Sequence, residues 1–140
     1  MDGQYYVWYT KRNTVAPPQG AGKHTDTKPS TDWDLCEIWY ATSIDGFSWQ
    51  EQGVAIERPC KPNVGWRSVS TPDILLWENK YYLYYQGFQE ASGTKGDHCP
   101  VTVSVADSPD GPWTSVNEVV ISTGNAMVSG INFPFMILIH

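Results

Sequence analysis

The chain has 140 residues, of which 41% are hydrophobic and 17% are charged. This composition excludes a disordered segment and indicates a globular domain of modest size. The formal net charge is -6 and no run of Lys and Arg occurs, which argues against a nucleic acid or an anionic membrane as the partner. Aromatic residues make up 14% of the chain, a content that favours β-structure and also suits the stacking of rings on sugars.

The cysteines and the ends of the chain carry no metal or targeting signal. The chain has an odd number of cysteines, and no two of them have metal-ligand spacing: Cys36, Cys60 and Cys99. We therefore expect free thiols or packing groups, with one disulfide as the alternative. Met1 is followed at once by a polar turn and a strand, which predicts no secretory signal and leaves the compartment undetermined. The apolar segment 131–140 is too short to span a bilayer, and we expect no membrane partner.

Two segments recur in the same order along the chain. Segment 2–10 resembles segment 78–86, since each has a polar turn, two Tyr, an aliphatic residue, an aromatic residue and a further Tyr. Segment 38–49 resembles segment 103–113, and both contain an Asp-Gly hairpin signal followed by a Trp. Because both similar segments occur in the same order in each half of the chain, the sequence predicts two copies of one structural unit.

Taken in chain order, these units have the pattern of β-strands. Segment 5–9 is apolar on both alternating faces, which predicts a strand in a sheet that is covered on both sides. Cys36 begins the next strand at a position that matches an apolar residue of the second unit, so we expect it to be a packing residue. The second unit is predicted to have four strands, at about 70–77, 80–87, 100–106 and 113–121. Gly and Pro interrupt every stretch of helical length, and no helix is expected.

Four antiparallel strands per unit, with both sheet faces buried, describe a blade of a β-propeller. We therefore expect an all-β fold with two four-stranded blades of an incomplete ring, the first blade lacking its opening strand. The single partial domain would span residues 1–140, with repeats at about 2–60 and 66–124 and an atypical tail at 125–140. Two blades leave apolar faces and edges uncovered, so we expect either a truncated piece or a homo-oligomer that covers them.

Candidate site residues gather where the second unit begins. Trp66 and Arg67 precede Asp73, which is a carboxylate at the start of a strand expected to be buried. Asp73 is predicted to orient a sugar hydroxyl or to tune a neighbouring acid. The alternative is that Asp73 caps a turn after Pro72.

The long loop from Lys11 to Asp34 supplies further candidates. His24 is a candidate general acid or hydroxyl ligand, and His98 lies in the matching loop of the second unit, although a solvated histidine is the simpler interpretation of either. The carboxylates of Asp26, Asp32 and Asp34 lack the spacing of a calcium loop. We expect no cofactor, with a divalent cation in this loop as the alternative.

Four stretches resemble glycoside hydrolase family 117 and, more loosely, the five-bladed propeller glycosidases of family 43. These stretches are residues 5–12, 33–49, 67–75 and 106–113, and the likeness extends over about 2–124. The resemblance implies an enzyme that removes 3,6-anhydro-L-galactose from the non-reducing end of agar oligosaccharides. It also implies that Thr71 and Asp73 match the family's Thr-x-acid pair, which contacts the sugar, and that Arg67 matches the arginine just upstream.

The same resemblance implies that the catalytic machinery is incomplete. The family's catalytic base is an Asp in an Arg-Asp-Pro motif on a strand that would precede Asp2, and its acid lies on later blades. Because glycoside hydrolysis needs two carboxyl groups, Asp73 alone does not supply both. We expect a hydrolase-like fragment that is inactive alone and whose ligand is an oligosaccharide. The alternatives are a non-catalytic carbohydrate-binding or assembly module and a structural relic.

Overall fold

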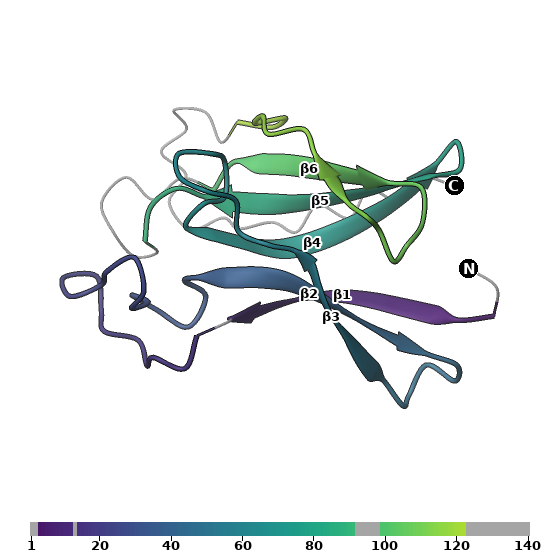
Figure 1. Ribbon diagram of the computed structural model, residues 1–140, viewed down its shortest axis with the longest axis horizontal. Coiled ribbons are helices and arrows are strands. Elements are labelled where there is room, and N and C mark those ends of the chain that lie inside the picture. Colours follow the sequence, from purple (N-terminus) through teal and green to yellow (C-terminus); the bar gives the residue numbers. More distant parts are fainter. Residues whose placement is uncertain (1–2, 13, 92–98, 123–140) are drawn as a thin grey trace.

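A computed structural model describes residues 3–12, 14–91 and 99–122, which form two antiparallel β-sheets (Figure 1). The first sheet has the strand order β1-β2-β3 and the second has the order β4-β5-β6-β7. The strands are β1 (Tyr5–Arg12), β2 (Cys36–Ser43), β3 (Gln50–Ile56), β4 (Ser68–Trp77), β5 (Lys80–Phe88), β6 (Val101–Ala106) and β7 (Thr114–Ser115). The described residues contain no helix, so none of them forms a helical membrane span. The predicted all-β fold is confirmed, and the predicted tail at 125–140 lies outside the described residues.

The first sheet has three strands among the described residues, one fewer than the second. β1 pairs with β2 so that Trp8 lies opposite Tyr40, and β2 continues into β3 through an Asp-Gly turn. Aromatic and β-branched side chains are frequent in β1 and β2 because they pack well on a pleated surface. β1 of this sheet corresponds to β5 of the second.

The second sheet has four strands, and its last strand is shorter than predicted. β7 covers only two residues of the segment expected at 113–121. Asn117 adopts a positive φ of 55°, which turns the chain out of the strand direction, and a single bridge then joins Ile121 to Val101. The prediction of one continuous strand over 113–121 did not include that turn.

The core lies between the two sheets, where β4 packs against both β1 and β2 (Figure 1). Its buried members come from both sheets: Ile38, Ile56, Val69, Leu83 and Tyr85. Trp8 and Trp113 meet edge to face across the interface, with ring centroids 6.2 Å apart. Cys36 is buried at the start of β2, which confirms its role as a packing residue, and burial raises the pKa of its thiol to about 11.

In the part of the chain that the structure describes, β1 is covered on one face, and its other face is one of the apolar faces that two blades are expected to leave uncovered. Trp8 faces the second sheet, but Tyr5 is 56% exposed and Val7 is 37% exposed on the opposite face. No described strand packs on that face, because β4, the neighbour of β1 across the core, lies on the other side. An apolar outer face of the first sheet therefore remains accessible.

The two Asp-Gly turns have the same sequence signal but different hydrogen bonds. In the first turn the Asp45 Oδ1 atom accepts hydrogen bonds from the backbone N–H groups of Phe47 and Ser48. In the second turn the chain continues with Pro112, which has no N–H to donate. The Asp110 carboxylate instead accepts a hydrogen bond from the Tyr6 hydroxyl of the first sheet, at 3.2 Å.

Candidate carbohydrate site

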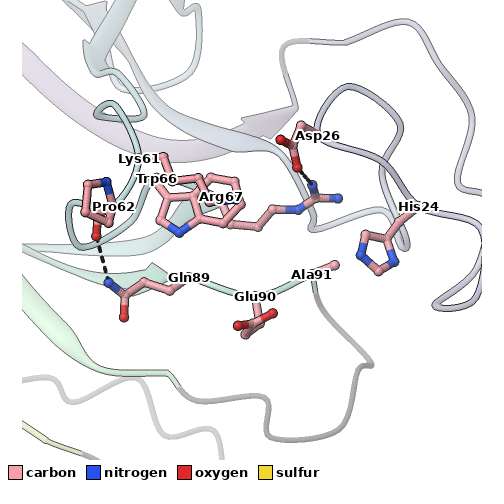
Figure 2. A pocket seen from close by; sticks show the side chains of 9 residues that line it. All are labelled: His24, Asp26, Lys61, Pro62, Trp66, Arg67, Gln89, Glu90 and Ala91. Carbon is pink, nitrogen blue, oxygen red and sulfur yellow. Dashed lines mark hydrogen bonds and ion pairs between the residues drawn. The ribbon is translucent and has the colours of Figure 1, made fainter.

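A cavity of about 420 Å³ opens at the end of the second sheet where β4 begins and β5 ends (Figure 2). Three segments line it: the loop between β1 and β2, the residues before β4 and the residues after β5. The lining residues are His24, Asp26, Lys61, Pro62, Trp66, Arg67, Gln89, Glu90 and Ala91. Three of the predicted site residues, His24, Trp66 and Arg67, are thus brought together, whereas Thr71 and Asp73 are not among the lining residues.

Arg67 and Asp34 form a buried ion pair beneath this cavity. The Arg67 Nε atom donates to Asp34 Oδ1 at 2.9 Å, and Nη2 donates to Oδ2 at 2.7 Å. Both side chains are almost fully buried, and the backbone N–H of Ser30 adds a third hydrogen bond to the same carboxylate at 2.7 Å. Burial alone opposes ionisation of Asp34, but the hydrogen bonds from Arg67 and Ser30 hold its pKa below the ordinary value.

The remaining donors of Arg67 also point at the protein. Its Nη1 atom donates to the carbonyl of Thr25 at 2.7 Å and lies 3.7 Å from the Asp26 carboxylate, while Nη2 lies 3.4 Å from the carbonyl of Lys28. One guanidinium therefore holds both ends of the segment 25–34 against the start of β4. In this geometry Arg67 fixes the loop that carries one wall of the cavity.

Trp66 gives the cavity an aromatic wall that is only partly buried. The Lys61 ammonium lies 4.3 Å from the centre of the Trp66 ring, in the range of a cation–π contact. Beside it, Gln89 donates to the carbonyl of Pro62 at 3.1 Å, which ties the end of β5 to the segment before β4 (Figure 2). An aromatic face next to amide and carboxylate groups has the chemistry that sugar rings and hydroxyls require.

His24 lies opposite these groups, on the loop between β1 and β2 (Figure 2). Its Nδ1 atom is 2.7 Å from the carbonyl oxygen of Ala21. A carbonyl only accepts hydrogen bonds, so Nδ1 carries the proton and Nε2 of the neutral ring is left as an acceptor. The neutral ring can therefore accept a hydrogen bond from a ligand hydroxyl.

Thr71 and Asp73 lie on a bulge within β4. The pairing of β4 with β5 is irregular between Ser70 and Asp73, and Thr71 adopts a positive φ of 50°, which is strained for a β-branched residue. The Thr71 N–H donates to the Thr10 hydroxyl of β1 at 2.9 Å, which supports the bulge from the first sheet. Thr71 is exposed, and Asp73 is half-buried with one carboxylate oxygen 3.0 Å from the Ile74 N–H.

The loop carboxylates have separate roles, and sequence reasoning did not distinguish them. The Asp32 side chain is 74% exposed and pairs with Arg12 at 3.2 Å, whereas the Asp34 side chain, two residues later, is 1% exposed. The described residues contain no group of three acidic, histidine or cysteine side chains that could hold a metal ion. His98 lies outside the described residues.

Comparison with known proteins agrees with the fold and the sequence pattern. No family model matches the chain, and no curated protein matches it. Among solved structures, Zg3597, a family 117 glycoside hydrolase from the marine bacterium Zobellia galactanivorans, is 67% identical with a TM-score of 0.80. That likeness covers 82% of this chain and 34% of the Zg3597 chain.

Two further solved structures, one of them a family 43 enzyme, share the fold at lower identity. CoXyl43, a β-xylosidase/α-arabinofuranosidase from a compost metagenome, is 23% identical with a TM-score of 0.61, over 85% of this chain and 32% of its own. The RS223 β-xylosidase is 15% identical with a TM-score of 0.60, over 85% and 33% of the respective chains. The chain thus spans about a third of the length of each of these enzymes. The two sheets are blades of the β-propeller fold, and the chain is a partial counterpart of a glycoside hydrolase of family 117.

Proposed function

We propose that this chain carries part of the substrate site of a family 117-type hydrolase that removes terminal 3,6-anhydro-L-galactose from agar-type oligosaccharides. The observation that carries the proposal is the bulge in β4, where Thr71 is held at a φ of 50° beside Asp73. Strained backbone conformations and bulges occur preferentially at functional sites, where they direct side chains toward a ligand. The 67% identity to a family 117 enzyme supports the family, while the agar-type substrate is the finer part of the proposal.

The residues have distinct proposed roles. The Asp73 carboxylate accepts a hydrogen bond from a sugar hydroxyl and is the group closest to a catalytic role, and the exposed Thr71 hydroxyl binds beside it. Trp66 and His24 contact sugar units that extend into the cavity. Arg67 is a positioning residue, because its guanidinium donates to Asp34 and to loop carbonyls.

We further propose that the chain binds sugar without cleaving it. Hydrolysis of a glycosidic bond uses two carboxyl groups that flank it. β4 carries a single carboxylate, Asp73, and the bulge places no second acid next to it on the strand. A hydroxyl-binding group without its partner acid supports affinity and gives no turnover.

Calorimetry with neoagarobiose tests whether the chain binds sugar at Thr71 and Asp73, and an assay for released anhydrogalactose tests whether it cleaves the sugar. We expect binding heat without product, and loss of binding in Asp73→Asn and Thr71→Ala. Asp107→Asn is the matched control, because the Asp107 side chain is 86% exposed and pairs only with Lys80 among the described residues. Binding that survives in Asp73→Asn would contradict the site. Product formation by the wild-type chain would contradict the absence of turnover.

A non-catalytic binding or assembly module is the second candidate. Its supporting observation is the cavity itself, which brings Trp66, Gln89 and Glu90 together while Thr71 and Asp73 lie outside its lining. On this proposal Trp66→Ala abolishes sugar binding and Asp73→Asn leaves it unchanged. The same calorimetric series therefore separates the two candidates.

A further inference from the structure

The two sheets use opposite faces to contact one another. On β1, Tyr6, Trp8 and Thr10 face the second sheet, where they meet Asp110, Trp113 and Thr71 respectively. On β5, the buried residues Leu83 and Tyr85 face the first sheet and belong to the shared core. The interface thus joins the even-numbered face of β1 to the odd-numbered face of β5.

The sequence repeat relates these faces to the two that remain. In the alignment of the two repeats, Val7 of the first unit corresponds to Leu83 of the second, and Trp8 corresponds to Tyr84. The outer face of β1, with Tyr5 and Val7, is therefore the counterpart of the β5 face that packs against the first sheet. Side chains alternate along a strand, so the outer face of β5 carries Tyr82 and Tyr84, which are the counterparts of Tyr6 and Trp8.

By the repeat, the two outer faces are therefore equivalent to the two faces that pack against each other inside one molecule. On the first sheet, Tyr5 and Val7 are exposed. On the second sheet, Tyr82 and Tyr84 are half-buried, with the half-buried Leu75 opposite Tyr82 in the register of β4 and β5. A polar rim borders the first of these faces, where Lys11 pairs with Glu51 at 2.8 Å and lies 4.0 Å from the centre of the Trp39 ring.

We propose that a second copy of this chain docks head to tail, so that its Tyr82 and Tyr84 face covers the Tyr5 and Val7 face of the first. The contact repeats the packing between the two sheets of one molecule, with an apolar centre and a polar rim. Because it joins two different faces, the interface is heterologous, and further copies add in the same sense until a ring closes or a filament grows. The inference rests on the repeat and on the exposed face, and it holds whether or not the chain binds sugar.

Sedimentation velocity on the chain and on two charged variants tests the proposal. We expect the wild-type chain to form species larger than a dimer as its concentration rises. Val7→Asp disables the outer face of the first sheet and Tyr82→Asp disables that of the second, so each variant alone is monomeric. An equimolar mixture of the two variants retains one intact face of each kind and forms a 1:1 dimer.

Controls separate association from folding. Val15→Asp makes the same substitution at a fully exposed loop position, 102% exposed, and is expected to associate like the wild-type chain. Circular dichroism and thermal melting establish that each variant is folded, and Tyr5→Asn and Tyr82→Asn replace any charged variant that is not.

Three results would overturn the proposal. One is a wild-type chain that stays monomeric at every soluble concentration. Another is a Tyr82→Asp variant that still dimerises while Val7→Asp does not, because that pattern belongs to a symmetric contact of the first sheet with itself. The third is a mixture of the folded Val7→Asp and Tyr82→Asp variants that yields only monomers.

Discussion

Removing the charge of Asp34 tests the buried ion pair most directly. Asp34→Asn keeps the shape of the side chain but removes the buried counter-charge of the Arg67 guanidinium, because both side chains of the pair are at most 2% exposed. The carboxylate that remains near Arg67 is that of Asp26, which is 3.7 Å away and 75% exposed. Breaking a buried pair on one side costs about 3–5 kcal/mol of stability. In a chain of this length that loss corresponds to a fall of about 10–15 °C in the melting temperature.

Thermal unfolding followed by circular dichroism measures this loss, with Asp32→Asn as the matched control. Asp32 lies on the same loop and pairs with Arg12, but its side chain is 74% exposed. An exposed pair contributes about 0–1 kcal/mol, so the control should melt close to the wild-type chain. Equal melting temperatures for the two variants would refute the role assigned to Asp34.

The pH dependence gives a second measurement of the same pair. The folded-state pKa of Asp34 is depressed, so the pair contributes fully above the ordinary value of 3.8 and its contribution is lost as the pH falls through the folded-state pKa. The difference in stability between the wild-type chain and Asp34→Asn should therefore be constant near neutral pH and shrink below 3.8. A stability difference that grows as the pH falls would contradict the conclusion that folding lowers the pKa of Asp34.

Three further predictions follow from backbone conformation and burial. Thr71→Gly relieves the positive φ of an exposed residue and should raise the free energy of unfolding in urea by about 1 kcal/mol, whereas a loss of that size would contradict the strain. Gly65→Ala should lower that free energy by at least about 1 kcal/mol, because its Cβ would lie 2.6 Å from a valine methyl at a φ of 87°, and Gly22→Ala, with open space around it, should leave it nearly unchanged. Cys60 is exposed and should react with a thiol reagent in the folded chain, whereas Cys36, with a pKa of about 11, should react only after unfolding, as mass spectrometry of labelled peptides would show.

The sequence predicts the strands well because their signal is local. The repeated Tyr-Tyr segments and the Asp-Gly turns each lie within a few residues, and they place β1, β5 and both hairpins correctly. The opening strand of the second sheet was predicted at 70–77 and is observed as Ser68–Trp77. The short β7 escaped prediction because a single residue, Asn117, redirects a segment that was predicted as one continuous strand.

The candidate site was predicted less completely because its organisation depends on contacts between distant residues. Arg67 was selected from its position beside Trp66 and Asp73, but its partner Asp34 lies 33 residues away and has two acidic neighbours of similar appearance in the loop. Burial distinguishes Asp34 from Asp32, and burial follows from the packing of the loop on β4. The role of Asp73 in sugar binding stays a prediction.

The two Asp-Gly hairpins differ in one backbone N–H donor, and this difference accompanies a contact between the sheets that only the second hairpin makes among the described residues. At Asp45 the amides of Phe47 and Ser48 both donate to one carboxylate oxygen, so the Asp45 bonds stay within the hairpin. At Asp110 a proline removes one of those amides, and the carboxylate bonds to Tyr6 in the other sheet. Equivalent aspartates in such a repeat are therefore not interchangeable: replacing the first loosens a turn, and replacing the second loosens the contact between blades.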